Sequence, residues 1–315
     1  MPHAITRRLA LTLGAAFFPA LALAAPQGWS PLLEPAELAA LLDAHGEEIR
    51  VVHVTGDFAQ GHIPGAVSSP YPNWRSDAVN PGALRELEDL QTVVRDLGID
   101  TQTPVVVVHD GSNPTDMGAA ARVYWTLKSL GIEDLALLNG GFAGWTGADL
   151  PVSTTPASIA PSGYTAQWDE SWRISTDEVV ELVEAGDSRL IDARPTDFFS
   201  GVQWSIAAPG TIRGSDNLTY ESFFDGNRML DANHIRALAE REGYTDEPLT
   251  VSFCNTGHWA AINWFALSEM AGIDNTRLYA ESMAEYAAEG LPMDNAPGRV
   301  AYYWRATSRW VSDLF

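Results

Sequence analysis

Residues 251–260 read VSFCNTGHWA and contain Cys254, the only cysteine among 315 residues. The apolar run that ends at Phe253 is typical of a buried strand, and residues 257–272 show helical spacing of apolar side chains. Cys254 therefore heads a short loop between a strand and a helix, where free backbone amides stabilise a thiolate. The pattern predicts a reactive thiol, with a buried and inert cysteine as the alternative.

The rest of the second half continues this alternation. Residues 188–195 (SRLIDARP) form a strand-like run, whereas residues 231–243 and 283–290 have the spacing of amphipathic helices. Strands that alternate with helices favour βα units on a mainly parallel sheet. The expected fold class is therefore α/β.

The first half carries the same landmarks in the same order. Residues 61–66 (GHIPGA) correspond to residues 210–215 (GTIRGS), and the strand ending at Asp110 corresponds to the strand ending at Cys254. An ordered set of such matches indicates a duplicated unit. The uncharged segment 151–161 (PVSTTPASIAP) is typical of a linker. We expect one domain over residues 25–155 and another over residues 162–315.

The N-terminus has the layout of a secretory signal peptide. Arg7 and Arg8 precede an apolar run, and the run ends in Ala22-Leu23-Ala24, a small-residue cleavage pattern. The run is shorter than the roughly 20 residues of a membrane-spanning helix. We expect residues 1–24 to be removed and the mature protein to be periplasmic. Whether export uses the general or the twin-arginine route stays open.

Charge and composition exclude several classes of partner. The formal net charge is -22, which repels nucleic acid backbones and anionic lipid. We therefore expect no nucleic acid partner, and no membrane association after signal cleavage. The histidines lack the spacing of metal ligands, so we expect no metal site.

With these motifs in order, the sequence resembles the rhodanese family of sulfurtransferases in its two-domain form. The resemblance rests on IDARP (191–195), GTIRGS, the loop headed by Cys254, and YAESMAEYAAEGLP (279–292), together with GHIPGA and LNGGFAGW (138–145) in the first half. It implies two rhodanese-like domains, each with a central parallel sheet flanked by helices. It also implies that the N-terminal domain is inactive, with Asp110 in place of a cysteine, and that the C-terminal domain is catalytic.

The resemblance further implies a double displacement through a Cys254 persulfide. The thiolate takes a sulfur from a small donor, and a thiol or cyanide then removes it. This double displacement requires no organic cofactor. Cys254 is the implied catalytic residue. The implied substrate-binding or loop residues are Asn255, Thr256, Gly257, His258, Trp259, Ala260, Arg194, Arg213 and Ser282.

The loop departs from its relatives, because Asn255 and Thr256 stand where thiosulfate-using members usually have Arg and Lys. Arg194 and Arg213 are the remaining candidates for positive charge, and each is either a substrate ligand or a structural brace. His258 either contacts an anionic donor and assists proton transfer, or packs on a neighbouring tryptophan. Ser282 is placed where family members have a residue that faces the pocket.

The sequence leaves several functions to compare. We favour thiosulfate as the donor, with 3-mercaptopyruvate second and a persulfide carrier that serves a protein acceptor third. A phosphatase loop needs arginine six positions after the cysteine, and Ala260 stands there, so the phosphate clamp is missing. The aromatic tail over residues 299–315 is expected to pack as a strap.

Overall fold

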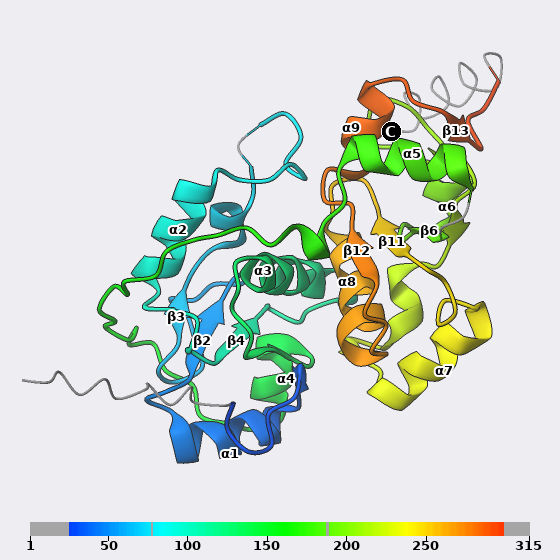
Figure 1. Ribbon diagram of the computed structural model, residues 1–315. Coiled ribbons are helices and arrows are strands. Elements are labelled where there is room, and N and C mark those ends of the chain that lie inside the picture. Colours follow the sequence, from blue (N-terminus) through cyan, green and yellow to red (C-terminus); the bar gives the residue numbers. More distant parts are fainter. Residues whose placement is uncertain (1–24, 77, 187–188, 299–315) are drawn as a thin grey trace, which may run out of the picture.

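The computed structural model describes residues 25–76, 78–186 and 189–298. The segments predicted as a signal peptide (1–24) and as a packed strap (299–315) lie outside these ranges. The described chain forms two lobes that meet along a pair of central helices (Figure 1). Each lobe contains a parallel sheet with helices on its faces, so the predicted α/β class is confirmed.

The first domain contains a parallel sheet of five strands in the order β1-β5-β4-β2-β3. Valine and leucine fill its central strands, which are buried on both faces as expected for a parallel sheet. The strands are β1 (Leu32–Leu33), β2 (Arg50–His53), β3 (Val67–Ser68), β4 (Val105–Val108) and β5 (Leu135–Leu138).

Four α-helices cover this sheet. A capping box at Glu34 and Pro35 at the first helical position start the first of them. Leu90 and Val94 form the buried side of the amphipathic second helix. The helices are α1 (Pro35–His45), α2 (Leu87–Asp96), α3 (Met117–Ser129) and α4 (Gly141–Gly147), with 3-10 turns η1 (Tyr71–Trp74) and η2 (Pro114–Asp116).

The second domain repeats the architecture with a parallel sheet in the order β12-β11-β6-β8. Its strands are β6 (Arg189–Asp192), β8 (Asp216–Asn217), β11 (Thr250–Phe253) and β12 (Thr276–Leu278). Two antiparallel pairs accompany them, β9 (Phe224–Asp225) with β10 (Arg228–Met229) and β7 (Thr211–Ile212) with β13 (Met293–Asp294).

The helices of the second domain begin and end at clear signals. Ser175 caps α5 through a capping box, Asp231 caps α7, and left-handed glycines end both. The helices are η3 (Glu170–Trp172), α5 (Thr176–Ala185), α6 (Thr196–Phe199), η4 (Tyr220–Phe223), α7 (Ala232–Glu242), α8 (Trp259–Phe265) and α9 (Ser282–Ala288), and a π-helix (η5, Ala266–Met270) continues α8.

The two sheets correspond strand for strand, and their registers correct one sequence match. Val108 pairs with His53 in the first domain, as Phe253 pairs with Asp192 in the second. The residue after Val108 is His109, so His109, not Asp110, occupies the position of Cys254. The prediction that Asp110 replaces the cysteine was wrong by one residue, because strand ends cannot be placed this closely from an apolar run.

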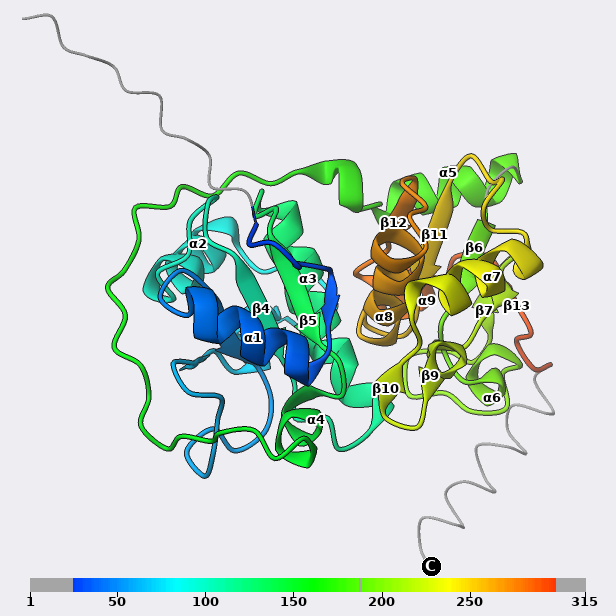
Figure 2. The same ribbon diagram turned by 90° about the horizontal axis from the view of Figure 1, so that it is seen from below.

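The linker between the domains extends beyond the predicted segment 151–161. Figure 2 shows the segment after α4 passing round the edge of the first domain before it reaches α5. The Tyr164 hydroxyl donates to the carbonyl oxygen of Leu130 at 2.5 Å, and the Ala166 amide donates to Gln91 at 3.0 Å. Residues 162–169, which we assigned to the second domain, therefore pack on the first one.

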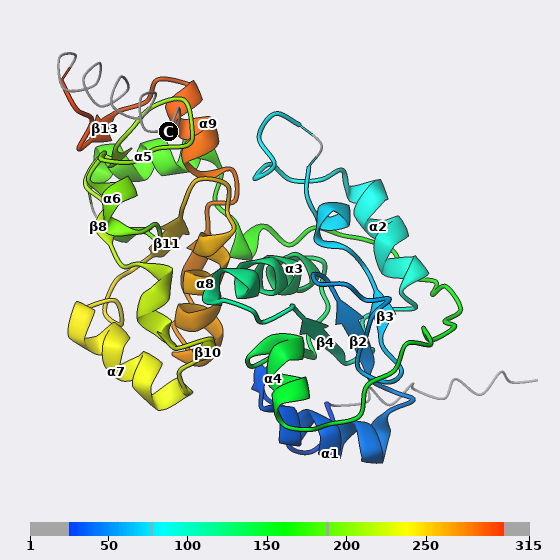
Figure 3. The ribbon, with the colours of Figure 1, turned by 180° about the vertical axis from the view of Figure 1, so that it is seen from behind.

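The domain interface is built around α3 and α8, which lie side by side in all three views (Figure 3). Nearly every side chain of α3 is buried, as expected for a helix that is covered on all sides. Tyr124 packs edge-on against Phe265, and Glu269 accepts hydrogen bonds from Tyr124 and from Lys128. One hydrophobic core runs through both domains, so their relative position is fixed by packing.

Among the described residues, no helix has the length and apolar content that a bilayer crossing needs.

Candidate active site

Cys254 directly follows β11 and is only 1% exposed. Its amide donates to the Ser282 hydroxyl at 3.2 Å, and this hydroxyl donates to the Tyr279 carbonyl oxygen at 2.7 Å. The carbonyl oxygen of Cys254 accepts from the Met283 amide. Ser282 was expected to face a substrate pocket, but it is fully buried with φ of 57° and holds the backbone of Cys254 in place.

The loop after Cys254 leaves its amides available. Within the part of the chain that the structure describes, the amides of residues 255–258 donate to no protein acceptor. Gly257 has φ of 68°, and a Cβ atom there would overlap Arg122 Nη1 and the carbonyl oxygen of Ala280. The tight left-handed turn therefore requires glycine. Free amides around a sulfur atom can hold a thiolate or a persulfide anion.

Arg194 is a brace for this loop. Its guanidinium donates to both oxygens of Asp192, to the carbonyl oxygen of Gly210 at 2.7 Å, and to Asn255 Oδ1 at 3.0 Å. The side chain is completely buried. Because Asp192 neutralises its charge and no face is open to a ligand, the structure gives Arg194 the structural role, not the substrate-binding one.

Arg213 lies apart from the loop. It is exposed, its amide donates to the carbonyl oxygen of Pro292, and its positive charge acts on Tyr286. Among the described residues, no hydrogen bond or ion pair joins Arg213 to the loop after Cys254. Its place in the predicted set of site residues is therefore not supported by proximity.

Trp259 and Ala260 begin α8. The Trp259 indole stacks on Tyr220 with ring centroids 5.2 Å apart, contacts Phe198 edge-on, and donates to the Thr115 hydroxyl at 3.2 Å. Ala260 is fully buried. Trp259 thus forms an aromatic wall on one side of the loop, and Ala260 belongs to the core.

Both ring nitrogens of His258 contact the first domain. Its Nε2 lies 2.9 Å from the carbonyl oxygen of Thr115, and its Nδ1 lies 3.3 Å from the Tyr71 hydroxyl. Burial, followed by the charge of Arg75, lowers the pKa of His258 to about 4. The buried imidazole is therefore neutral near neutral pH, which does not support the alternative in which His258 offers positive charge to an anionic donor.

The positive charge beside the loop comes from two arginines of the first domain that sequence reasoning missed. Arg75 Nη2 donates to the carbonyl oxygen of Thr256 at 2.9 Å, and Arg122 Nη1 donates to the carbonyl oxygen of Gly257 at 3.5 Å. Burial, and next the charge of Arg75, lower the pKa of Arg122 to about 10, so it stays protonated at neutral pH. Arg122 is the only charged residue in the apolar segment 117–127, a pattern that indicates a buried charge with a specific partner.

A cavity of about 420 Å³ adjoins the loop where the domains meet. Arg75 and Tyr71 of the first domain form one wall, and Thr256 and His258 form the other. Part of the Arg75 side chain faces this space. The cavity can hold a small anion next to the loop, with an arginine and backbone groups as its polar contacts.

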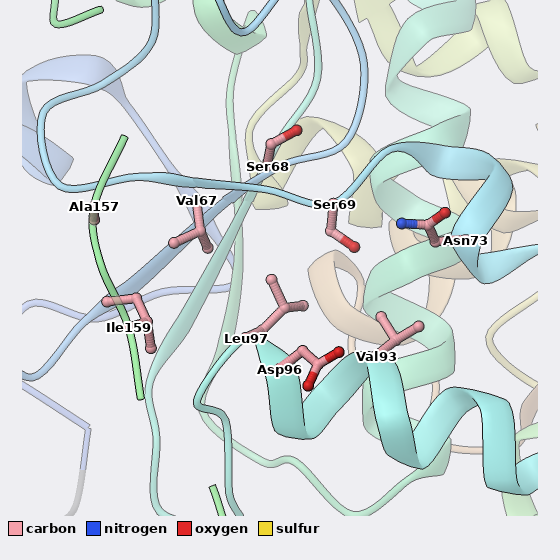
Figure 4. Close-up of a pocket in the computed structure, with 9 residues that line it drawn as sticks. All are labelled: Val67, Ser68, Ser69, Asn73, Val93, Asp96, Leu97, Ala157 and Ile159. Atoms are coloured by element: carbon pink, nitrogen blue, oxygen red, sulfur yellow. The ribbon is translucent and has the colours of Figure 1, made fainter. Parts of the chain in front are cut away.

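A second cavity, about 410 Å³, lies in the first domain (Figure 4). Ser69, Asp96 and Leu97 line it together with linker residues Ala157 and Ile159. The Ser69 hydroxyl already accepts a hydrogen bond from Trp74 Nε1 at 2.9 Å. This cavity includes no residue of the Cys254 loop. In the described ranges, no group of three or more His, Cys, Asp or Glu side chains is arranged to hold a metal ion.

Comparison with known proteins places this site in a family. Residues 34–148 and 175–289 each match the Rhodanese-like domain. The chain is 26% identical over 254 residues to "Putative thiosulfate sulfurtransferase" of Synechococcus elongatus, covering 77% of this chain and 78% of that protein. It is 28% identical over 266 residues to "Sulfur carrier protein TtuD" of Thermus thermophilus, covering 78% and 90%.

A solved structure agrees on the fold. SseA from Escherichia coli, described as a 3-mercaptopyruvate sulfotransferase, superposes with a TM-score of 0.71 at 21% identity, over 80% of this chain and 98% of its own. The predicted family, fold and enzyme class are confirmed. With both halves of the chain matched and its curated relatives named for sulfur transfer, the chain belongs to the rhodanese family and is a two-domain sulfurtransferase.

Proposed function

We propose that the protein transfers sulfur from thiosulfate through a persulfide on Cys254. The proposal rests mainly on one observation, the position of Cys254 at the head of a loop whose amides are free and whose carbonyl oxygens are bound by Arg75 and Arg122. These groups favour an anion at the loop without any charged residue in the loop itself.

The first step is a displacement at sulfur. The Cys254 thiolate attacks the outer sulfur of thiosulfate, a new S–S bond forms, and the S–S bond of the donor breaks. Sulfite leaves with the electron pair of the broken bond. The outer sulfur of the persulfide then lies about 2 Å from Cys254 Sγ.

The second step returns the enzyme to its starting state. A nucleophile such as cyanide or a thiolate attacks the outer sulfur, and Cys254 leaves as a thiolate. The chain has no second cysteine, so no internal thiol can take the sulfur as a disulfide partner. The acceptor must therefore come from outside the chain.

Thiosulfate fits the cavity beside Arg75 because it is small and doubly negative. The formal net charge of the protein is -22. The guanidinium groups of Arg75 and Arg122 have no ion-paired carboxylate among the described residues, so they give the site a local field opposite to that of the whole surface. 3-Mercaptopyruvate carries one negative charge and gains less from this field. It is the second candidate donor.

Intact mass measurement tests the proposal. The reduced protein is incubated separately with thiosulfate, 3-mercaptopyruvate and glutathione persulfide, and then weighed. We expect a gain of one sulfur atom with thiosulfate, and none in Cys254→Ser. A gain with 3-mercaptopyruvate alone would reject the donor assignment, and no gain with any donor would reject persulfide chemistry.

A sulfur carrier that serves a protein acceptor is the alternative, favoured by the similarity to TtuD. The 1% exposure of Cys254 argues for small reactants, since a folded partner cannot reach a buried thiol. Steady-state turnover with thiosulfate and cyanide separates the two functions. An enzyme turns over many times, whereas a carrier loads once and then waits for its partner.

We also propose that the protein works in the periplasm. Arg7 and Arg8, the apolar run after them and the Ala22-Leu23-Ala24 pattern support export with cleavage. An unpaired cysteine in an oxidising compartment is exposed to unwanted oxidation. Its burial at the domain interface limits that damage.

A further inference from the structure

Two arginines of the first domain bind consecutive carbonyl groups of the loop after Cys254. Arg75 reaches the Thr256 carbonyl oxygen, and Arg122 reaches the Gly257 carbonyl oxygen. Arg122 also donates to the Gly82 carbonyl oxygen at 2.9 Å and lies over the Trp125 ring at 4.9 Å. Both guanidinium groups are therefore held by their own domain in positions that match the loop of the other domain.

Because peptide groups are planar, these two contacts also determine which way the amides of Gly257 and His258 point. In a planar trans peptide, the carbonyl oxygen and the N–H of the next residue point in opposite directions. The Thr256 carbonyl shares its peptide with the Gly257 amide, and the Gly257 carbonyl shares its peptide with the His258 amide. Carbonyl oxygens drawn toward the first domain therefore turn these two amides away from it, into the loop headed by Cys254.

The charges of the two arginines are not neutralised locally. Within the described ranges, neither Arg75 nor Arg122 forms an ion pair with a carboxylate, in contrast to Arg194 with Asp192. Arg75 also donates to the Tyr71 hydroxyl at 2.5 Å, and Nε of the buried Arg122 has no partner. The Glu281 carboxylate acts on Arg122 through space without forming an ion pair with it. Positive charge without a directly paired carboxylate thus lies behind the loop.

Building on the proposed function, we propose that Arg122, assisted by Arg75, is a positioning residue for sulfur transfer. The first domain has no cysteine, but it orients the amides that stabilise the anionic sulfur of the second domain. It also supplies positive charge that related loops carry in their own sequence. Neither arginine is required to touch the donor for this role, although Arg75 lines the adjoining cavity.

The test measures the reactivity of Cys254 without using any sulfur donor. Cys254 is the only thiol, so alkylation by iodoacetamide, a neutral reagent, reports its reactivity directly. The rate constant at pH 7 is measured for wild type, Arg122→Lys and Arg122→Met. Thermal unfolding midpoints and the separate kcat and KM values for thiosulfate are recorded for the same proteins.

We expect Arg122→Met to slow alkylation about tenfold, the effect of losing one charge-assisted hydrogen bond to the loop. Its kcat should fall by a similar factor with a smaller change in KM, since the loss concerns the sulfur anion more than donor binding, for which Arg75 remains in place. Arg122→Lys keeps the charge and should recover part of the rate.

Lys128→Met is the matched control. Lys128 is another first-domain cation that crosses the same interface, where it contacts Glu269 at 2.9 Å and not the loop. Its alkylation rate should equal that of wild type. An equal loss in Lys128→Met and Arg122→Met would reduce Arg122 to a general interface contact and overturn the proposal.

The positioning role can still be tested if the Arg122→Met variant does not fold. If Arg122→Met is not recovered as folded protein, Arg75→Met and Arg75→Lys take its place, because Arg75 lies at the edge of a cavity where truncation disturbs less packing. Folded arginine variants that alkylate at the wild-type rate would overturn the proposal. If thiosulfate does not convert wild-type Cys254 to the persulfide, the donor proposal is rejected. The alkylation rates use no sulfur donor, so they still test the positioning role of Arg122.

Discussion

His258 Nε2 lies 2.9 Å from the carbonyl oxygen of Thr115, a residue of the other domain. A carbonyl oxygen only accepts hydrogen bonds, so Nε2 carries the proton, and Nδ1 is left to accept from the Tyr71 hydroxyl at 3.3 Å. The tautomer is thus fixed by two first-domain groups. A neutral imidazole satisfies both contacts, which agrees with the lowered pKa of His258.

His258 should therefore have no part in the pH dependence of catalysis between pH 5.5 and 8.5. We expect kcat/KM profiles for thiosulfate in wild type and His258→Gln to run parallel over this range, since glutamine can still donate to the Thr115 carbonyl oxygen. A step near pH 6.5 in wild type that disappears in the variant would show a titrating imidazole in the reaction.

Cys254→Ser should abolish sulfur transfer and leave the fold intact. The Ser282 and Met283 contacts involve only the backbone of residue 254, so they survive the substitution, but a serine hydroxyl cannot form a persulfide. Thiocyanate production from thiosulfate and cyanide measures the loss, and thermal unfolding measures the fold. Turnover above a few per cent of wild type would locate the chemistry elsewhere.

Asp110→Ala should keep kcat/KM for thiosulfate within about twofold of wild type. The register makes Asp110 the first-domain counterpart of Asn255, and its contact with Thr55 uses the backbone amide. Asn255→Ala is the informative partner, because it removes an acceptor from the buried Arg194 and costs about 1–3 kcal/mol of stability. If both variants lost kcat/KM for thiosulfate to a similar extent, the first-domain loop could not be assigned as catalytically silent.

Buried histidines should make folding weaker in acid. Burial, followed by the charges of His62 and His109, lowers the pKa of His53 to about 3, and burial lowers the pKa of His109 to about 4. The unfolded chain binds these protons near pH 6.5 while the folded chain does not. The free energy of unfolding therefore has its full value above pH 6.5 and falls as the pH drops from there toward 4. At pH 5 the decrease is about 2 kcal/mol for each of the two histidines.

Urea unfolding at pH 7.5 and 5.0 tests whether the free energy of unfolding decreases in acid. His109→Asn removes one such proton site, so its loss of unfolding free energy between the two pH values should be about 2 kcal/mol smaller than that of wild type. The carboxylates titrate equally in both chains and cancel in the comparison. An equal loss in both proteins would mean that His109 does not resist protonation.

The mature protein should begin at Ala25. N-terminal sequencing of protein isolated from its native host tests the export signal read from Arg7, Arg8 and the Ala22-Leu23-Ala24 pattern. Retention of residues upstream of Pro19 would contradict cleavage at this point.

Local sequence patterns were enough to predict the repeated α/β order and the loop headed by Cys254, because strand and helix periodicity and the glycine turn are local properties. The cation partners were not predictable in this way. Arg75 and Arg122 lie more than 130 residues from the loop that they contact, and no spacing rule links two domains. The roles of Arg194 and Ser282 also depended on burial, which a motif does not reveal.

The side-by-side packing of α3 and α8 has a consequence for the history of the chain. Directly after a gene duplication, both halves carry the same loop. A half that then loses its nucleophile is normally free to accumulate further substitutions. Here the half without a thiol supplies Arg75 and Arg122, which bind the loop of the other half. Selection for sulfur transfer alone would preserve it, and no second reaction is needed to explain why both copies persist.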